Sequence, residues 1–248
     1  MRLLSRLLLC LAFSMPLMAE NSRLPTVRLA AENSWAPYSD ERGEGLSNRL
    51  VKAAYAAVGY EVDISVMPYA RVEYQVLNGV SDGGFNVTRQ ASTEDLFLYG
   101  RVPLLKAAAS FYFSREHAKA FESYDALPDG TRIGLILGYE YGDIYQANRH
   151  RFIETRVSYQ YQLIRMLLAG RIDAAIMFDE VAKFTLAEMQ LPKGSLQQGF
   201  QNHVSDIYVA FSPNNPSAQN LSERLDKGLS LLKESGEYRR LYTETLTQ

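Results

Sequence analysis

The chain has 248 residues, of which 26 are basic and 28 acidic, so its formal net charge is −2. This near balance excludes a large basic surface of the kind that binds nucleic acid or an anionic membrane. The three histidines lack metal-ligand spacing, and a single cysteine permits no internal disulfide. We therefore expect a protein without metal or cofactor, held together by a core drawn from its 47% hydrophobic residues.

The first 19 residues have the order of a secretory signal peptide. Arg2 and Arg6 form a basic start, an apolar run covers residues 7–13, and Ala19 is a small residue at the expected cleavage site. The run is too short to span a membrane, which takes roughly 20 residues. Removing Arg2 and Arg6 leaves 24 of the 26 basic residues against 28 acidic ones, and Cys10 is lost as well. We expect export to the periplasm and a core that is stable without disulfides.

The first third of the chain predicts one α/β unit. Val27 and Leu29 mark a strand, and apolar residues at helical spacing between 46 and 58 predict a helix that Gly59 ends. Residues 62–66 alternate as a strand, Pro68 opens a second helix, and residues 83–87 follow as a third strand. This β-α-β-α-β series predicts a parallel sheet covered by helices.

A second series of elements follows a mixed stretch. Residues 131–137 predict a strand, residues 138–142 a loop, and residues 163–167 part of a helix that Gly170 closes. A strand over residues 174–178, a helix after it, a strand over residues 207–211 and a long terminal helix complete the series. Two α/β lobes in one chain predict a cleft between them, where small ligands bind preferentially.

The segment Gly79-Val80-Ser81-Asp82-Gly83 matches the G-x-S-x-G pattern of serine hydrolases. That motif needs a strand before the serine and a helix after it, whereas here the predicted order is helix, turn, strand. Asp179 and His203 do follow in the chain order that such hydrolases use. We interpret the segment as a glycine-rich turn between a helix and a strand.

Short stretches along nearly the whole chain resemble one protein family. They are Trp35-Ala-Pro-Tyr38, Gly45-Leu46, Met67-Pro-Tyr-Ala-Arg71, Leu77-Asn-Gly79 ahead of Asp82-Gly83, Leu168-Ala-Gly-Arg-Ile-Asp173, Tyr208-Val-Ala-Phe211, and a closing helix with Gly236 and Tyr242. In this order they are similar to type II periplasmic solute-binding proteins of family 3, the group that serves polar amino-acid uptake.

The resemblance implies a two-lobed fold with two crossovers between the lobes. Residues 24–109 and 204–248 would form the first lobe and residues 110–203 the second, with hinges at 107–113 and 203–207. Ligand contacts from both lobes would favour a closed state. The function implied is capture of a small solute by a monomer and its delivery to a membrane permease.

One part of the family pattern differs in this chain. The family usually has Thr-x-x-Arg after the third strand, where the arginine binds the α-carboxylate of the ligand. Here Ala91 or Thr93 occupies the arginine place, depending on the register, and Arg89 lies one residue after Thr88. A carboxylate contact and a surface role for Arg89 are equally compatible with the sequence.

The rest of the expected site also follows from the resemblance. Asp179 matches the aspartate that receives the amino group of the ligand, although it is also placed to cap the helix that follows it. Aromatic residues at element ends would enclose an apolar or planar part of the ligand. The expected ligand-binding residues are Trp35, Tyr38, Tyr69, Arg71, Thr88, Arg89, Tyr139, Tyr141 and Asp179.

Two other functions remain open at this stage. A ligand sensor of the same fold would report to a membrane receptor instead of a permease. An enzyme on a similar fold, a periplasmic dehydratase of prephenate-like acids, would need a general acid, for which Glu140 and Asp179 are the candidates.

Overall fold

The computed structural model describes residues 23–115 and 121–246. The predicted signal peptide, residues 1–19, lies outside this range. Among the described residues, no helix is both long and apolar enough to cross a bilayer.

One sheet of nine strands runs through the whole molecule. Its order is β4 (Glu61–Met67), β1 (Thr26–Glu32), β5 (Gly83–Thr88), β11 (Leu196–Phe211), β7 (Leu105–Ser114), β10 (Ala174–Phe178), β8 (Arg132–Ile136) and β9 (Ile153–Val157), and β6 (Leu98–Tyr99) pairs with β11. Two short strands, β2 (Ser34–Trp35) and β3 (Ser39–Asp40), form a separate ribbon.

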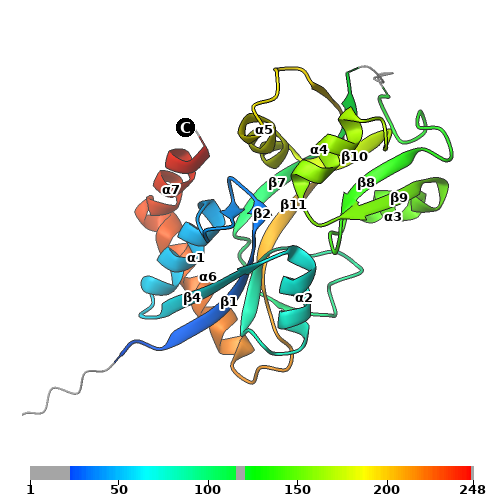
Figure 1. Ribbon diagram of the computed structural model, residues 1–248. Coiled ribbons are helices and arrows are strands. Elements are labelled where there is room, and N and C mark those ends of the chain that lie inside the picture. The colour runs from blue at the N-terminus through cyan, green and yellow to red at the C-terminus, as the bar shows by residue number, and fades with distance from the viewer. Residues whose placement is uncertain (1–22, 116–120, 247–248) are drawn as a thin grey trace, which may run out of the picture.

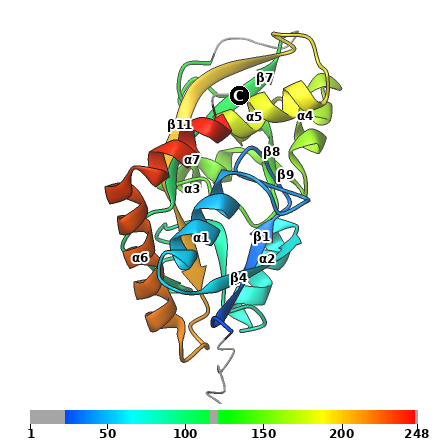
Figure 2. The same ribbon diagram turned by 90° about the vertical axis from the view of Figure 1, so that its left-hand side faces the viewer.

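The first lobe is built on β4, β1 and β5, which are parallel as the sequence predicts. Helix α1 (Leu46–Ala56) contacts α6 (Ala218–Ser235) and α7 (Glu237–Leu246), and α2 (Tyr69–Leu77) covers the other face of the sheet (Figure 1). The predicted leucine stripe of α6 is buried. The terminal helices therefore return to the lobe in which the described chain begins, as both views show (Figure 2).

The second lobe is built on β10, β8 and β9, which are also parallel. Helix α4 (Gln160–Leu168) packs on β8 and β10, and α5 (Asp179–Glu188) packs on β7 and β10. Helix α3 (Asp143–Asn148) and the 3₁₀ turn η1 (Arg149–Arg151) lead into β9, a strand that was not anticipated from the sequence. The predicted mixed α/β, two-lobed fold is confirmed.

The two crossovers between the lobes are long strands that pair with each other. Strands β7 and β11 are antiparallel from Leu196 opposite Ser114 to Ile207 opposite Leu105. The sequence marked only residues 207–211 as a strand and residues 107–113 as a hinge, so the extent of this pairing is a new finding. The lobe boundaries at residues 109/110 and 203/204 fall inside these strands, and they remain a prediction.

The glycine-rich turn owes its composition to close packing. A Cβ at Gly84 would lie 2.7 Å from Val72 Cγ1 and 2.9 Å from Val76 Cγ2, both on α2. Only a residue without a side chain lets this helix approach β5 so closely. Gly84 therefore serves the contact between helix and strand, and Gly83 allows close approach to β11, because a Cβ there would lie 2.7 Å from the carbonyl oxygen of Ala210.

Gly228 offers a test of the packing between α1 and α6. A Cβ there would lie 2.0 Å from the carbonyl oxygen of Ala54. Alanine is favoured over glycine by about 1 kcal/mol in a helix, but overpacking costs about 1–3 kcal/mol and more for a backbone clash. We expect Gly228→Ala to lower the free energy of unfolding in urea. Lys227→Ala, on the exposed neighbouring position, is the control that should leave it unchanged, and a stabilised Gly228→Ala protein would contradict the packing.

Candidate functional site

The carboxyl ends of the central strands of both lobes meet where the lobes touch. Strand β1 ends at Glu32 and β5 at Thr88 in the first lobe, while β8 ends at Ile136 and β10 at Phe178 in the second. In open α/β sheets, ligands bind outside the carboxyl ends of strands. Contacts between the lobes include the hydrogen bond from the Gly142 N–H to Gln90 Oε1, at 2.9 Å. We call this region the lobe junction.

Six aromatic side chains form a cluster at the lobe junction. The ring centroids of Trp35 and Phe178 are 5.1 Å apart, and those of Tyr69 and Tyr139 are 4.9 Å apart, each pair in edge-to-face contact between the lobes. The ring centroids of Tyr38 and Trp35 are 4.4 Å apart. The aromatic cluster consists of Trp35, Tyr38, Tyr69, Tyr139, Tyr141 and Phe178, all of them buried. Five of these six are residues that the resemblance assigned to the site.

Glu32 is a buried carboxyl group between the lobes. Its side chain is 1% exposed, Oε1 accepts a hydrogen bond from the Tyr139 hydroxyl, and Oε2 has no partner among the described residues. Burial raises the pKa of Glu32 to about 8, and the hydrogen bond from Tyr139 opposes that rise. The group is therefore largely protonated at neutral pH, because removal from water disfavours the carboxylate.

Asn86 is also incompletely bonded. It lies near the carboxyl end of β5, where the pairing with β11 is irregular: Val209 pairs with Phe85 and Tyr208 with Val87, so Asn86 is passed over. Asn86 is 5% exposed, its φ is 70°, and neither its amide oxygen nor its amide nitrogen has a partner in the described structure. Strained backbone and buried unpaired polar atoms are each costly and occur together mainly at functional sites.

Further polar atoms at the lobe junction lack partners within the described chain. Trp35 Nε1 and Gln160 Oε1 belong to fully buried side chains, and the N–H of Gln160 reaches Ser34 Oγ in the other lobe at 3.4 Å. The ring of His203 packs on Phe178, and its Nε2 is buried without a partner. These atoms are oriented for hydrogen bonds that the described protein atoms do not make.

The hydrogen bonds of Asn202 define the protonation of His203. The amide Nδ2 of Asn202 donates to the Tyr141 carbonyl at 2.8 Å and its Oδ1 accepts from Tyr124, which fixes the orientation of the amide. The same Nδ2 lies 2.6 Å from His203 Nδ1, which must accept. Burial lowers the pKa of His203 to about 4, so the ring is neutral and carries its proton on Nε2. His203 thus contributes a neutral donor to the lobe junction.

Asp179 does not cap the helix that follows it. Helix α5 begins at Asp179 itself, the N-cap position is Phe178, and no side chain caps the helix. The capping interpretation is therefore wrong. The carboxylate instead accepts a hydrogen bond from the Tyr112 hydroxyl at 3.1 Å. Burial raises the pKa of Asp179, and hydrogen bonds from Ser110 and Tyr112 oppose the rise.

The remaining predicted residues lie outside the aromatic cluster. Arg89 forms an ion pair with Glu94 at 2.5 Å, and its side chain is 45% exposed. Arg71 is exposed on α2. Thr88 is buried, and its hydroxyl accepts a 3.4 Å hydrogen bond from Gln90, the residue that contacts the second lobe. Of the two residues at the place of the family arginine, Thr93 is buried against the carbonyl of Thr88 and Ala91 is exposed.

Ser81 is far from the residues that would complete a catalytic triad. It precedes β5, is 5% exposed, and donates a hydrogen bond to Gln75 Oε1 at 2.8 Å. His203 lies beyond the opposite end of β5, because β11 pairs Phe211 with Gly83 and Ile207 with Thr88. The six residues of β5 span roughly 20 Å. The geometry gives Ser81 no base.

Pockets open at both edges of the lobe junction. One, of about 380 Å³, lies between residues 33–42 of the first lobe and Phe184, Thr185 and Glu188 of α5. The other, of about 330 Å³, is lined by Arg89 and Gln90 on one side and by Gly142 and His203 on the other. Neither Glu32 nor any member of the aromatic cluster lines either pocket.

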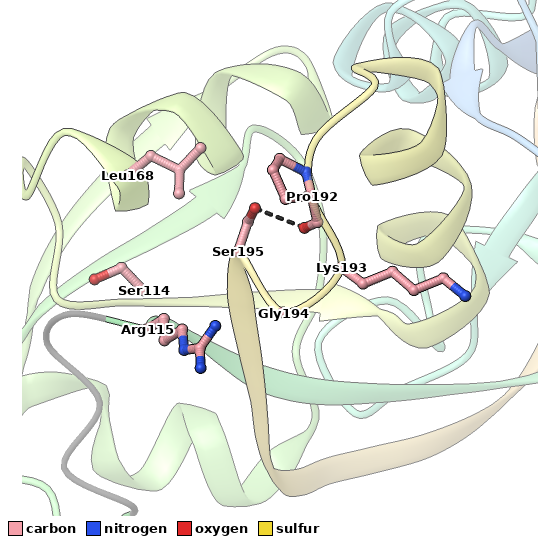
Figure 3. Close-up of a pocket in the computed structure, with 7 residues that line it drawn as sticks. All are labelled: Ser114, Arg115, Leu168, Pro192, Lys193, Gly194 and Ser195. Carbon is pink, nitrogen blue, oxygen red and sulfur yellow. Dashed lines mark hydrogen bonds between the residues drawn. The ribbon is translucent and has the colours of Figure 1, made fainter.

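A third pocket, of about 280 Å³, lies at the distal end of the second lobe, where β7 ends and β11 begins (Figure 3). Its lining includes Arg115, Lys193 and Ser195, and Ser195 Oγ donates to the Pro192 carbonyl at 2.7 Å. None of the predicted site residues lines it, and it adjoins the end of the crossover strand β7, not the carboxyl ends of β8 or β10. We assign it no part in the site.

Solved structures with the same fold are numerous. An ancestral arginine-binding protein bound to glutamine is 19% identical, with a TM-score of 0.75 over 92% of this chain and 100% of that one. A substrate-binding protein of an amino-acid ABC transporter from Streptococcus pneumoniae, bound to L-arginine, is 21% identical, with a TM-score of 0.73 over 90% and 94%. A histidine kinase sensor domain similar to periplasmic binding proteins is 16% identical, with a TM-score of 0.76 over 90% and 97%.

These likenesses establish the fold of the chain as that of two-lobed periplasmic solute-binding proteins. By sequence, no protein-family model matches the chain, and no curated protein does.

Sequence reasoning missed the polar groups at the lobe junction. Glu32 ends the strand Thr26–Glu32, and Asn86 interrupts the buried strand Gly83–Thr88 between Phe85 and Val87. A charged or amide side chain at the carboxyl end of a buried strand is the signal that points to such a group. His203 was considered only as a metal ligand or triad member, and its packing on Phe178 is visible only in three dimensions.

The buried carboxyl of Glu32 should make stability depend on pH. Its pKa is about 8 in the folded protein against an ordinary 4.5, so between these values the folded state binds more protons than the unfolded state. Stability therefore falls as pH rises through this window, by up to about 1.4 kcal/mol per pH unit for one group. Burial also raises the pKa of Glu73, to about 7, which adds to the trend.

We expect Glu32→Gln to reduce the change in unfolding free energy with pH, by an amount that corresponds to at most one bound proton. Urea unfolding of both proteins without ligand at pH 5, 6 and 7.5 measures it. Equal slopes in the two proteins would mean that Glu32 is not held protonated in the folded state.

Proposed function

We propose that the protein is a periplasmic solute-binding protein, which encloses a small polar solute between its lobes and delivers it to a membrane transporter. The solute class is an amino acid or a related amine or carboxylate. The observation that carries this proposal is the set of buried, unpaired polar atoms at the lobe junction, on Glu32, Trp35, Asn86, Gln160 and His203. Leaving such atoms unpaired costs free energy unless a ligand supplies the missing hydrogen bonds.

The arrangement of the site supports binding coupled to closure. Strand ends of both lobes contribute to it, through Glu32, Trp35 and Asn86 on one side and Tyr139, Phe178 and Gln160 on the other. A ligand that contacts both sides binds only when they are together, so it stabilises the closed state by the difference in contacts. Binding proteins and a sensor domain share this architecture.

A sensor is the second candidate function. The likeness to a histidine kinase sensor domain supports it, since the same closing movement would then report to a receptor. A pull-down of membrane partners with and without ligand separates the two functions. In both cases the closed protein captures the partner, which is a permease for a transport protein and a kinase for a sensor. The dehydratase alternative predicts aromatic products from prephenate-like acids, and we expect none.

Asp179→Asn tests whether Asp179 holds the amino group of the ligand. Asparagine keeps the shape and can still accept the hydrogen bond from Tyr112, so the fold should be preserved. Loss of a charge that pairs with a buried ligand cation costs about 2–5 kcal/mol, which is more than tenfold in affinity. Ligands come from a thermal-shift screen of amino acids, amines and organic acids, and calorimetry measures the affinity of the best one.

The control is Ser81→Ala, because Ser81 bonds to Gln75 away from the lobe junction. Its affinity should equal that of the wild type. If Asp179→Asn also binds normally, Asp179 belongs to the internal structure of the second lobe. If nothing in the screen raises the melting temperature, the binding function itself is wrong.

A further inference from the structure

In the described chain, the carboxyl groups at the lobe junction outnumber its free cations. Glu32 lies between the lobes, and Glu73 on α2 adjoins the loop that holds Tyr139, with its Oε2 2.6 Å from the place of a Cβ on Gly138. Glu140, in the same loop, is close enough to raise the pKa of Glu73 by its charge. A ligand carboxylate would therefore meet further carboxyl groups, which repel it wherever they are ionised.

The nearby cations are already engaged. Arg156 pairs with Glu154 at 3.1 Å and donates to the Tyr139 carbonyl at 3.2 Å, while Arg89 pairs with Glu94. Within residues 23–115 and 121–246, no ion pair joins Glu32 or Glu73 to a lysine or arginine. A carboxylate on the ligand would thus be buried without the guanidinium that normally compensates it.

The aromatic cluster favours the opposite charge. Tyr139 bonds to Glu32, and Tyr69 packs on the ring of Tyr139. Aromatic faces attract cations through their quadrupole. Glu32 Oε2, once deprotonated, and Asn86 Oδ1 are unpaired acceptors near the carboxyl ends of the two paired strands β1 and β5. An ammonium group has three N–H donors and no acceptor, and so matches this environment. The unpaired N–H groups of Trp35 and His203 are neutral donors. They suit an uncharged ligand oxygen better than a ligand carboxylate, because they carry no charge that would compensate it.

We propose that the ligand is an organic cation without a carboxylate, an amine or guanidine whose charged group binds Glu32 and Asn86 within the aromatic cluster. The inference rests on the proposed function and narrows its solute class. It assigns the charge contact to Glu32, a residue outside the set expected to bind the ligand.

Binding of such a cation must release a proton. Without ligand, burial keeps Glu32 protonated below about pH 8. Of the groups that face it, the Tyr139 hydroxyl favours the carboxylate through its hydrogen bond but does not offset burial, and the charge of Glu73 raises the pKa of Glu32 further. A bound cation favours the carboxylate and lowers its pKa. Binding below pH 8 therefore expels the proton of Glu32, and affinity rises with pH up to that value.

Matched ligand pairs test the inference directly. Agmatine and arginine, putrescine and ornithine, and histamine and histidine differ within each pair only by the α-carboxylate. We expect the decarboxylated member of at least one pair to bind ten times more tightly or better in calorimetry at pH 6.5. The measured heat should also vary with the ionisation enthalpy of the buffer, in the sense of proton release. This second readout uses the wild-type protein and does not depend on any variant.

Glu32→Gln keeps the size of the side chain and removes the charge. We expect it to weaken amine binding at least tenfold and to abolish the proton release, while Glu223→Gln, which removes the same charge from the exposed face of α6, changes neither. Melting temperatures verify that both variants are folded.

Three results would overturn the inference. They are equal or tighter binding of the amino acids, absence of binding by all three amines, and amine binding without proton release. In the first case the proposed function stands with an amino acid as ligand. If neither these solutes nor the wider screen binds, the proposed function fails as well.

Discussion

The hydrogen bond from Tyr139 to Glu32 joins the two lobes at a point where both groups are buried. A carboxyl group in such a place must be neutral, or it must have a partner that compensates its charge. In the described structure it is neutral and half-bonded, with one oxygen unpaired. This condition depends on how the lobes meet, because Tyr139 comes from the second lobe and Glu32 from the first. The closed arrangement thus contains an acceptor whose best partner is a donor with positive charge.

The surrounding elements are built so that these two residues meet. Glu32 reaches the edge of the first lobe because it ends a strand whose last four residues are buried and which is parallel to β4 and β5. Tyr139 is presented by the loop after β8, where Gly138 has a φ of 87° and leaves room for Tyr69 and Glu73. The carbonyl of Tyr139 is held by Arg156. The position of each partner is therefore determined by its own lobe, and only their contact depends on closure.

Much of the fold was predictable because its strands and helices are strongly patterned. The alternation at residues 62–66, the apolar run at 174–178 and the leucines of α6 predict elements that the structure contains. The pairing of β7 with β11 was not predictable, since residues 196–206 are mostly polar and lack a strand pattern. Their extended form comes from the partner strand, which is a tertiary effect.

The site was predictable where residue type alone limits the position. Large aromatic side chains at element ends can be buried in few positions, and five of them are buried together at the lobe junction. The partners of charged residues were not predictable, because Arg89 meets Glu94 and Asp179 meets Tyr112 through loop and strand geometry. Asp179 as an N-cap was wrong for a related reason: a single-residue shift in where α5 begins changes the role of its side chain.

The paired crossovers determine which relative movements of the lobes are easy. A two-stranded antiparallel ribbon resists shear along its strands, because sliding β7 past β11 would break their hydrogen bonds, whereas bending out of the ribbon plane preserves them. The ladder is interrupted at two places, between Gln198 and Gln201 and between Gln201 and His203. Bulges are points where a strand bends at low cost. The ribbon therefore bends most easily about one axis. The segment that bends most easily lies next to His203, close to the residues that a ligand would contact.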